Sequence, residues 1–131
     1  MKEEIIYSDE DVYAIVSDTP LSHGHVLVIS KRHVERLEEL GIREITTLFQ
    51  TIKNLIPQLL NAVKARDYNL FINAGSQANQ SVSHLHVHIV PRRSSRNHLD
   101  VFFDAFVEEE SRRLSKEAIK RVAYSIREKI H

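Results

Sequence analysis

Hydrophobic and polar positions in the first thirty residues of the chain predict two short strands. Residues 12–17 (VYAIVS) and residues 25–30 (HVLVIS) are runs of mostly branched, apolar side chains, and Pro20 and Gly24 lie between them. Branched side chains fit the pleated, half-buried surface of a sheet, and turn residues between two such runs are typical of paired strands. We therefore predict that these two segments pair.

A longer periodic pattern in the middle of the chain predicts a helix. Apolar residues recur there at intervals of three and four, which is the spacing of one buried helix face. They are Ile45, Leu48, Phe49, Ile52, Leu55, Ile56, Leu59, Leu60 and Val63. Pro57 lies inside this pattern, and we expect a kink covered by core packing rather than a functional hinge.

Two further strands are predicted on either side of a polar loop. Residues 68–75 (YNLFINAG) and residues 83–91 (SHLHVHIVP) have the composition of strands, and residues 76–82 (SQANQSV) lie between them. Both strands therefore border this loop.

The C-terminal part of the chain predicts helices. A basic, Ser-rich segment at residues 92–98 precedes two helical patterns, at residues 100–113 and 115–130. In the second pattern Ser115 suits the N-cap and Glu117 the first turn. A sheet with helices segregated around it is an α+β fold.

Composition and charge bound the function classes. A chain of 131 residues with 42% hydrophobic side chains fits a single domain over residues 1–131. Lys and Arg total 18, as do Asp and Glu, so the net charge gives no reason to expect binding to nucleic acid or to a membrane surface. The chain has no cysteine, which excludes disulfides and agrees with a reducing compartment. Without a signal-peptide pattern or an apolar run of roughly 18 to 20 residues, we expect a soluble, cytoplasmic protein.

Histidines and apolar residues alternate in the fourth predicted strand. The histidines are His84, His86 and His88, and the residues that follow each of them are Leu85, Val87 and Ile89. Residues two apart in a strand share a face at a separation of about 6.6 Å, so the pattern predicts one packed face and one face with three imidazoles. Three interpretations are open: ordinary histidines on a half-exposed sheet, a metal site, or a site for phosphoryl chemistry.

The metal and phosphoryl interpretations need different additional groups. A Zn²⁺ ion binds imidazoles in tetrahedral geometry, and His23, His25 or His33 is a candidate for a further ligand, but no cysteine and no His-Glu-x-x-His pattern supports such a site. Phosphoryl chemistry needs one nucleophilic imidazole, which is neutral and reactive near pH 7, and donors for the phosphoryl oxygens. The alternation alone leaves both open.

The loop before the histidines offers neutral donors. Gly75 permits a tight turn or a close approach of the backbone. The donors around it are Asn73, Gln77, Asn79, Gln80 and Ser81. Polar turns with glycine are mostly structural, so the loop supports the phosphoryl interpretation only because it lies beside the histidines.

Residues 23–40, 69–82 and 83–92 together resemble the histidine triad (HIT) family of nucleotidyl hydrolases and transferases. The resemblance covers roughly residues 5–95. It implies a HIT-like antiparallel sheet of about five strands with one long helix, followed by a helical extension at about residues 98–130.

The resemblance gives the histidines different roles. His86, the middle one, is the expected nucleophile, His88 is the expected contact of the reacting phosphate, and His84 helps to orient the site. His25, which follows a glycine at the start of the second strand, is the expected partner of the triad. His33 has no role in the family pattern, and we expect it to be exposed.

The resemblance also indicates where the phosphates bind. It places Asn73, the backbone of Asn79, Gln80 and Ser81 around them. Family members commonly carry glycine at the position of Asn79. Asparagine is the best replacement for glycine if the backbone there is left-handed, so we expect the site to be kept.

The ribose site has two candidate residues. Members of the family often carry Asp or Asn eight residues before the position of His25, where this chain has Ser17 with Asp18 next to it. Either side chain is a candidate for binding the ribose hydroxyls. The candidates for a base pocket, each of which fits the core better, are Ile5, Ile6, Val16, Leu27 and Ile29.

The segments GHVLV and VERLEEL, the long tail after Pro91 and the lack of tryptophan resemble the fragile-histidine-triad branch and its diadenosine-polyphosphate hydrolase relatives. We therefore expect an enzyme that releases nucleoside monophosphate from nucleotide conjugates through a nucleotidyl-histidine. The alternatives are an adenosine phosphoramidate hydrolase, a nucleotide sensor with slow turnover and a zinc-binding protein. The covalent step requires no metal, although a polyphosphate substrate can bring Mg²⁺.

The residues after Pro91 and the oligomeric state are the subject of the remaining predictions. Arg92, Arg93 and Arg96 are placed to meet distal phosphates, and a solvated basic loop is an equal alternative. Three phenylalanines within residues 100–113 have helical spacing and are expected to pack on the sheet or on a partner subunit. The resemblance implies a homodimer in which two sheets continue edge to edge and the long helices pair.

Overall fold

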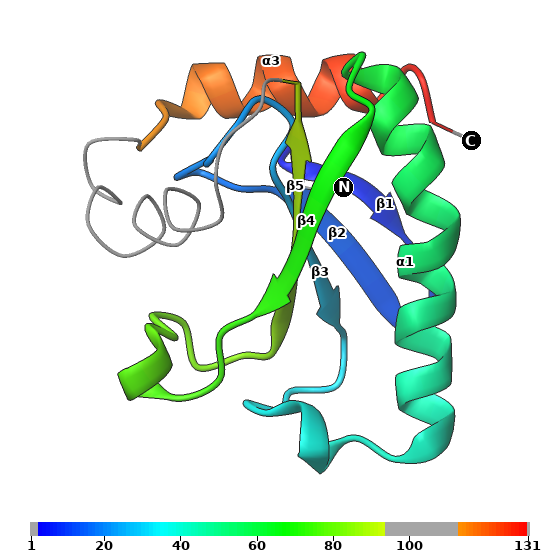
Figure 1. Ribbon diagram of the computed structural model, residues 1–131, viewed down its shortest axis with the longest axis vertical. Helices are drawn as coiled ribbons and strands as arrows, with labels where there is room; N and C mark the ends of the chain where they lie inside the picture. The colour runs from blue at the N-terminus through cyan, green and yellow to red at the C-terminus, as the bar shows by residue number, and fades with distance from the viewer. Residues whose placement is uncertain (1–2, 94–112, 131) are drawn as a thin grey trace.

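The computed structural model describes residues 3–93 and 113–130. In this part of the chain five strands form one antiparallel sheet in the order β1-β2-β3-β5-β4 (Figure 1). The strands are β1 (Ile5–Ser8), β2 (Val12–Val16), β3 (Val26–Ser30), β4 (Asp67–Ile72) and β5 (His86–Arg92). The helices are α1 (Ile42–Ala62) and α3 (Lys116–Arg127), and short 3-10 turns are η1 (Leu37–Glu39) and η2 (Ser76–Ala78). The predicted α+β fold is confirmed.

One face of the sheet forms the hydrophobic core under α1. The side chains of β3 and β5 on this face are fully buried, and they are Val26, Val28, Val87 and Ile89. The buried apolar stripe of α1 consists of Leu48, Ile52, Leu55, Leu59 and Ala62. Burying each large aliphatic side chain stabilises the fold by about 1.5–3 kcal/mol, so the alternation along β5 decides which face α1 covers. The histidines of β5 consequently lie on the other face.

The predicted strand pair is confirmed as β2 and β3, which run antiparallel with Val12 opposite Ser30 and Val16 opposite Val26. The hydrophobic pattern does not predict β1, because its four residues are too few to show an alternation. This strand pairs with β2 and contains an irregularity between Ile5 and Tyr7.

The strand that carries the histidines begins two residues later than the alternation suggests. In the structure β5 starts at His86, and both His84 and Leu85 precede it. The backbone N–H of Leu85 donates to the carbonyl of Val34, which lies outside β3, at 2.7 Å. The prediction that His84 shares a strand face with His86 and His88 is therefore wrong, because the chain enters the sheet only at His86, two residues after His84.

Helix α3 packs against the N-terminal strand. The hydroxyl of Ser115 accepts a hydrogen bond from the N–H of Ala118 at 3.1 Å, so the predicted N-cap is confirmed. At the other end of α3, Arg127 donates to the carbonyl of Ile5 at 2.7 Å, and Ile126 is buried in the core. Figure 1 shows α1 lying along the sheet and α3 crossing near one end of it.

The other predicted helix lies almost entirely outside the described residues. Its pattern spans residues 100–113 and includes Phe102, Phe103 and Phe106; Arg96 also falls outside the described part. Neither described helix combines the length and apolar character that crossing a membrane would require.

Candidate active site

A shallow pocket of about 90 Å³ lies on the face of the sheet opposite α1. Leu27, His88 and Phe71 stand side by side across β3, β5 and β4 and form its floor, because these residues are register partners. The pocket is lined by Ser17, Asp18, Thr19, Leu21, His25, Leu27, Phe71, Asn73, Asn79, Ser81, Val82, His86 and His88. Eight of the ten predicted site residues therefore meet in one place, and the exceptions are His84 and Gln80.

The ring of His86 is held by the backbone that precedes it. Its Nδ1 atom lies 2.8 Å from the carbonyl oxygen of His84. Because a carbonyl can only accept, Nδ1 carries the proton of the neutral ring, and Nε2 is left with a lone pair. The residue is 9% exposed and lines the pocket. This geometry suits a nucleophilic imidazole.

His25 and His88 form a hydrogen-bonded pair with a defined direction. The backbone N–H of Leu21 donates to Nδ1 of His25 at 3.0 Å, so the proton of His25 lies on Nε2. Nε2 of His25 is 3.0 Å from Nδ1 of His88 and donates to it. His88 must then carry its own proton on Nε2. The pair fixes one tautomer of each ring.

His88 stays neutral in this environment. Burial and the neighbouring His86 ring lower the pKa of His88 from 6.5 to about 3. Its ring stacks on Phe71 with 4.4 Å between the ring centroids. Nε2 of His88 is buried without a hydrogen-bond partner among the described residues. A buried donor without a partner is costly, and a substrate oxygen in the pocket would satisfy it.

His84 lies beside the pocket rather than in it. Its Nε2 atom contacts the carbonyl oxygen of Ser30 at 2.7 Å, and its ring meets His33 edge to face at 4.7 Å between centroids. The part of His84 that reaches the site is the carbonyl that accepts from His86. His33 is exposed, as predicted, but the sequence gives no signal for its contact with His84.

The loop before β5 contains two residues with positive φ angles. Asn79 has a φ angle of 68°, and Gly75 has a φ angle of 89°. The backbone of Asn79 is left-handed, the condition under which asparagine is the best replacement for glycine. Its backbone N–H donates to the carbonyl of Ser76 at 3.1 Å. The predicted donor to a phosphate is therefore engaged within the loop.

Gln80 supports the loop from behind the pocket. Its Oε1 atom accepts from the N–H of Gly75 at 2.7 Å, and its Nε2 atom donates to the carbonyl of Glu35 at 2.9 Å. Both ends of the amide thus bind the backbone. Gln80 does not line the pocket, whereas Asn73 and Ser81 do.

The two ribose candidates differ in what binds them. Ser17 is buried, and its hydroxyl accepts from the N–H of Thr19 at 3.2 Å. The carboxylate of Asp18 is half exposed and pairs with Arg113 at 2.8 Å. The carbonyl of Asp18 also accepts from the N–H of Leu114 at 2.7 Å, so the segment before α3 contacts the rim of the pocket.

Two of the three arginines expected at distal phosphates, Arg92 and Arg93, bind the fold in the structure. Arg92 donates to the side chain of Asn69 at 3.0 Å, and Arg93 donates to the carbonyl of Val63 at 2.9 Å. Neither lines the pocket. Their positions follow from the packing of β5 on β4 and on the end of α1, which the basic composition of the segment does not indicate.

Of the five candidates for a base pocket, Leu27 lines the site. Ile6, Val16 and Ile29 are buried, and Ile6 and Val16 belong to the main core cluster. Ile5 lies on the edge strand β1. The preference for a core role is thus confirmed for Ile6 and Val16.

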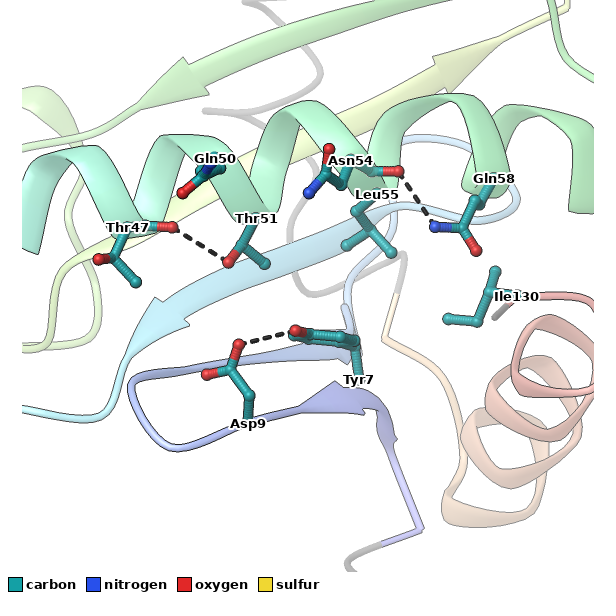
Figure 2. A pocket seen from close by; sticks show the side chains of 9 residues that line it. All are labelled: Tyr7, Asp9, Thr47, Gln50, Thr51, Asn54, Leu55, Gln58 and Ile130. Carbon is teal, nitrogen blue, oxygen red and sulfur yellow. Dashed lines mark hydrogen bonds between the residues drawn. The ribbon is translucent and has the colours of Figure 1, made fainter.

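A larger cavity of about 550 Å³ lies between β1 and α1 (Figure 2). It is lined by Tyr7, Asp9, Thr47, Gln50, Thr51, Asn54, Leu55, Gln58 and Ile130. Tyr7 donates to the carboxylate of Asp9 at 2.7 Å. The lining contains no histidine and no cationic side chain, so this cavity offers no imidazole nucleophile and no cation to a phosphate ester.

Within residues 3–93 and 113–130, no three His, Asp or Glu side chains are grouped so that they could hold a metal ion. The zinc interpretation needs such a group of ligands. In the described part of the chain, the histidines of the site bind one another and the backbone instead.

The fold and the pocket define an α+β protein with a histidine-lined pocket on one face of an antiparallel sheet. The chain belongs to the HIT domain family, which residues 1–95 match. A HIT-like protein of Methanocaldococcus jannaschii, named as uncharacterized, is 35% identical over 89 residues, which are 68% of each chain.

Two more relatives illustrate the range of similarity. The asymmetrical bis(5'-nucleosyl)-tetraphosphatase of Schizosaccharomyces pombe is 36% identical over 92 residues, which are 70% of this chain and 50% of that protein. The present chain thus spans about half the length of that relative. A crystal structure of a hypothetical histidine triad nucleotide-binding protein from Sulfolobus tokodaii superposes with a TM-score of 0.79 at 32% identity, covering 96% of this chain and 82% of that one.

Proposed function

We propose that the protein hydrolyses nucleotide conjugates of the dinucleoside polyphosphate type through a covalent nucleotidyl-His86 intermediate. One observation carries this proposal: the His84 carbonyl holds Nδ1–H of His86 at 2.8 Å, which leaves Nε2 as a lone pair in the pocket. The name of the S. pombe relative, a bis(5'-nucleosyl)-tetraphosphatase, supports this substrate class.

The reaction has two displacements at the α-phosphorus. Nε2 of His86 forms a bond to phosphorus, and the bond from phosphorus to the bridging oxygen breaks. The leaving nucleotide takes the electron pair of that bond. The oxygen of a water molecule then bonds to the same phosphorus, the phosphorus–nitrogen bond breaks, and its electron pair returns to Nε2. One proton of the water stays on the nucleoside monophosphate that leaves, and the other passes to solvent. His86 returns to its neutral tautomer.

His88 assists the leaving group as a neutral donor. Its Nε2–H is buried without a partner among the described residues, and a bridging oxygen would accept from it. A nucleoside polyphosphate leaves as a stable anion, so a hydrogen bond from the buried Nε2–H of His88 stabilises the developing charge without full proton transfer. His25 keeps the proton of His88 on Nε2 by donating to Nδ1 at 3.0 Å.

The loop and the rim bind the rest of the substrate. The amide of Asn73 and the hydroxyl of Ser81 are the neutral donors for the nonbridging phosphate oxygens, and both line the pocket. Asn79 contributes its side chain, because its N–H is used within the loop. For the ribose we favour Ser17 over Asp18, since Arg113 already binds the carboxylate of Asp18.

The active assembly is a homodimer through the free edge of β4. The sheet order leaves this strand unpaired on one side among the described strands. Tyr68 is 44% exposed and Leu70 is 39% exposed on it, and such apolar residues on an edge strand favour pairing with a second copy.

A substrate panel tests the proposal. Diadenosine polyphosphates, their guanosine counterparts and adenosine phosphoramidate are compared with wild-type protein and with His86→Ala, in the presence of chelator and of Mg²⁺. We expect wild type to release nucleoside monophosphate fastest from the polyphosphates, with activity retained in chelator. His86→Ala should lose at least about 10³-fold in kcat, whereas the exposed-site control His33→Ala stays within about twofold.

Three results would redirect the assignment. Faster turnover of phosphoramidate than of the polyphosphates would make the protein a phosphoramidate hydrolase. Tight nucleotide binding with negligible turnover would make it a sensor. Activity that disappears with removal of stoichiometric zinc would favour a metalloprotein.

A further inference from the structure

The turn between β2 and β3 is anchored to the strand that carries His88. The hydroxyl of Ser22 donates to the carbonyl of Pro91, at the end of β5, at 2.5 Å. The carbonyl of Ser22 accepts from the backbone N–H of His25 at 3.1 Å. A single residue thus connects the backbone of His25 to the strand on which His88 lies three positions before Pro91.

The neighbour of Ser22 determines the protonation of His25. Leu21 donates its backbone N–H to Nδ1 of His25 at 3.0 Å. An amide N–H cannot exchange donor and acceptor roles, whereas a histidine ring can. If this contact opened, His25 could carry its proton on Nδ1. His88 would then be free to turn its own proton toward His25, and its Nε2 would face the pocket as an acceptor.

We propose that Ser22 is a positioning residue: by anchoring the turn to Pro91, it keeps the Leu21 amide on His25 and thereby keeps a proton on His88 Nε2. The inference deepens the proposed hydrolase function and rests on it, because it explains how the leaving-group donor is set. Its central statement concerns the tautomers of two rings, which can be measured without turnover.

Nitrogen-15 NMR of the histidine rings tests the tautomers directly, because protonated and unprotonated ring nitrogens have well-separated shifts. In wild type near pH 7, Nδ1 of His25 and of His88 should be unprotonated and their Nε2 atoms protonated. In Ser22→Ala we expect the shifts of both rings to move toward averaged values while those of His86 stay in place. Ser22→Thr should keep the wild-type shifts, and so should the control Ser8→Ala on β1.

Kinetics test whether the anchor acts through His25. The loss of one hydrogen bond typically lowers a rate by about three- to tenfold, and we expect this loss in kcat for Ser22→Ala with KM within about twofold of wild type. In a His25→Gln background, Ser22→Ala should not lower kcat further, because the imidazole that connects Leu21 to His88 is already absent.

Two results would overturn the inference. Unchanged tautomers in Ser22→Ala would do so, and so would an equal loss of kcat in the wild-type and His25→Gln backgrounds. If Ser22→Ala does not fold, as judged by circular dichroism, Ser22→Cys replaces it, because its thiol is a weak donor of similar size. If wild type fails to hydrolyse any conjugate, the proposed function fails, while the NMR result still decides the role of Ser22.

Discussion

The histidines of this site differ in what each ring nitrogen contacts. Nδ1 of His86 donates to a backbone carbonyl, whereas Nδ1 of His88 accepts from His25. Two identical side chains two residues apart therefore present the same atom, Nε2, in opposite protonation states: a lone pair on His86 and a proton on His88. This difference comes from their partners, and the alternating sequence does not contain it.

His88 gives the fold a pH dependence with a defined sign. The pKa of His88 is about 3 in the folded protein and 6.5 for the free side chain, because burial disfavours the charged ring. Between these values the unfolded state binds more protons, so stability falls as pH falls from about 6.5 to about 3. Above about pH 6.5 the His88 ring is neutral in both the folded and the unfolded state, so it no longer makes the stability depend on pH.

Urea unfolding of wild type and His88→Gln at pH 7 and pH 4 measures this contribution. Between pH 7 and pH 4 we expect the free energy of unfolding to fall by at least about 1 kcal/mol more for wild type than for the variant, since each pKa unit corresponds to about 1.4 kcal/mol. Parallel pH dependences of the two proteins would refute the neutral, buried state of His88.

Asn79 lies in the left-handed region at a φ angle of 68°. Alanine in this conformation costs roughly 1–2 kcal/mol, whereas glycine adopts it without strain. We expect Asn79→Ala to lower the free energy of unfolding by about 1 kcal/mol and to raise KM, and Asn79→Gly to remain close to wild type in stability. Both are read from urea unfolding and steady-state kinetics; equal stability of the alanine and glycine variants would contradict the strain argument.

At the scale of elements, hydrophobic patterns predict the helices and strands that are long enough to show them, and they do not predict the short elements. The stripe of α1 and the apolar, branched runs of β2 and β3 can be read from the sequence. Strand β1 has four residues, and its position depends on α3, whose Arg127 binds the carbonyl of Ile5. A contact more than a hundred residues away along the chain leaves no local signal.

The site shows the same division. The residues that line the pocket come from the loop and strand that the sequence indicates. His84 and Gln80 belong to the same motif, but each contacts a backbone carbonyl outside it: His84 that of Ser30, the last residue of β3, and Gln80 that of Glu35, a few residues further on. Because this packing is tertiary, spacing alone assigns both residues to the pocket.

Gly24 shows how tightly the turn before His25 is constrained. Its φ angle is 91°, and a Cβ atom added there would lie 2.7 Å from Val63. We expect Gly24→Ala to cost about 2–4 kcal/mol through backbone strain and overpacking, and to lower kcat by displacing His25. Gly41→Ala is the matched control, since a Cβ there meets only Glu44 at 3.6 Å and should leave stability within about 0.5 kcal/mol. Similar unfolding midpoints for both variants would contradict this prediction, because they would mean that the turn accommodates a Cβ atom at position 24 without loss of stability.

At the scale of the whole molecule, the described sheet has two edges with different surroundings. Strand β1 contacts α3, whereas β4 exposes Tyr68 and Leu70. The proposed dimer uses the β4 edge, and a lysine in that interface would meet a second copy of itself. Leu70→Lys should therefore weaken dimerisation at least tenfold in sedimentation equilibrium, and Ser8→Lys on β1 should not. A monomeric wild type, or a dimer insensitive to Leu70→Lys, would exclude this interface.

The central claim is that His86 becomes covalently nucleotidylated, and rapid-quench trapping tests it most directly. Protein is mixed with diadenosine triphosphate labelled at the α-phosphate, stopped within milliseconds, and analysed for label retained on denatured protein and for intact mass. The account predicts a transient adduct of one nucleoside monophosphate per active site, localised to the peptide containing His86 and absent from His86→Ala. Turnover with no adduct at any time, or an adduct that persists in His86→Ala, would contradict it.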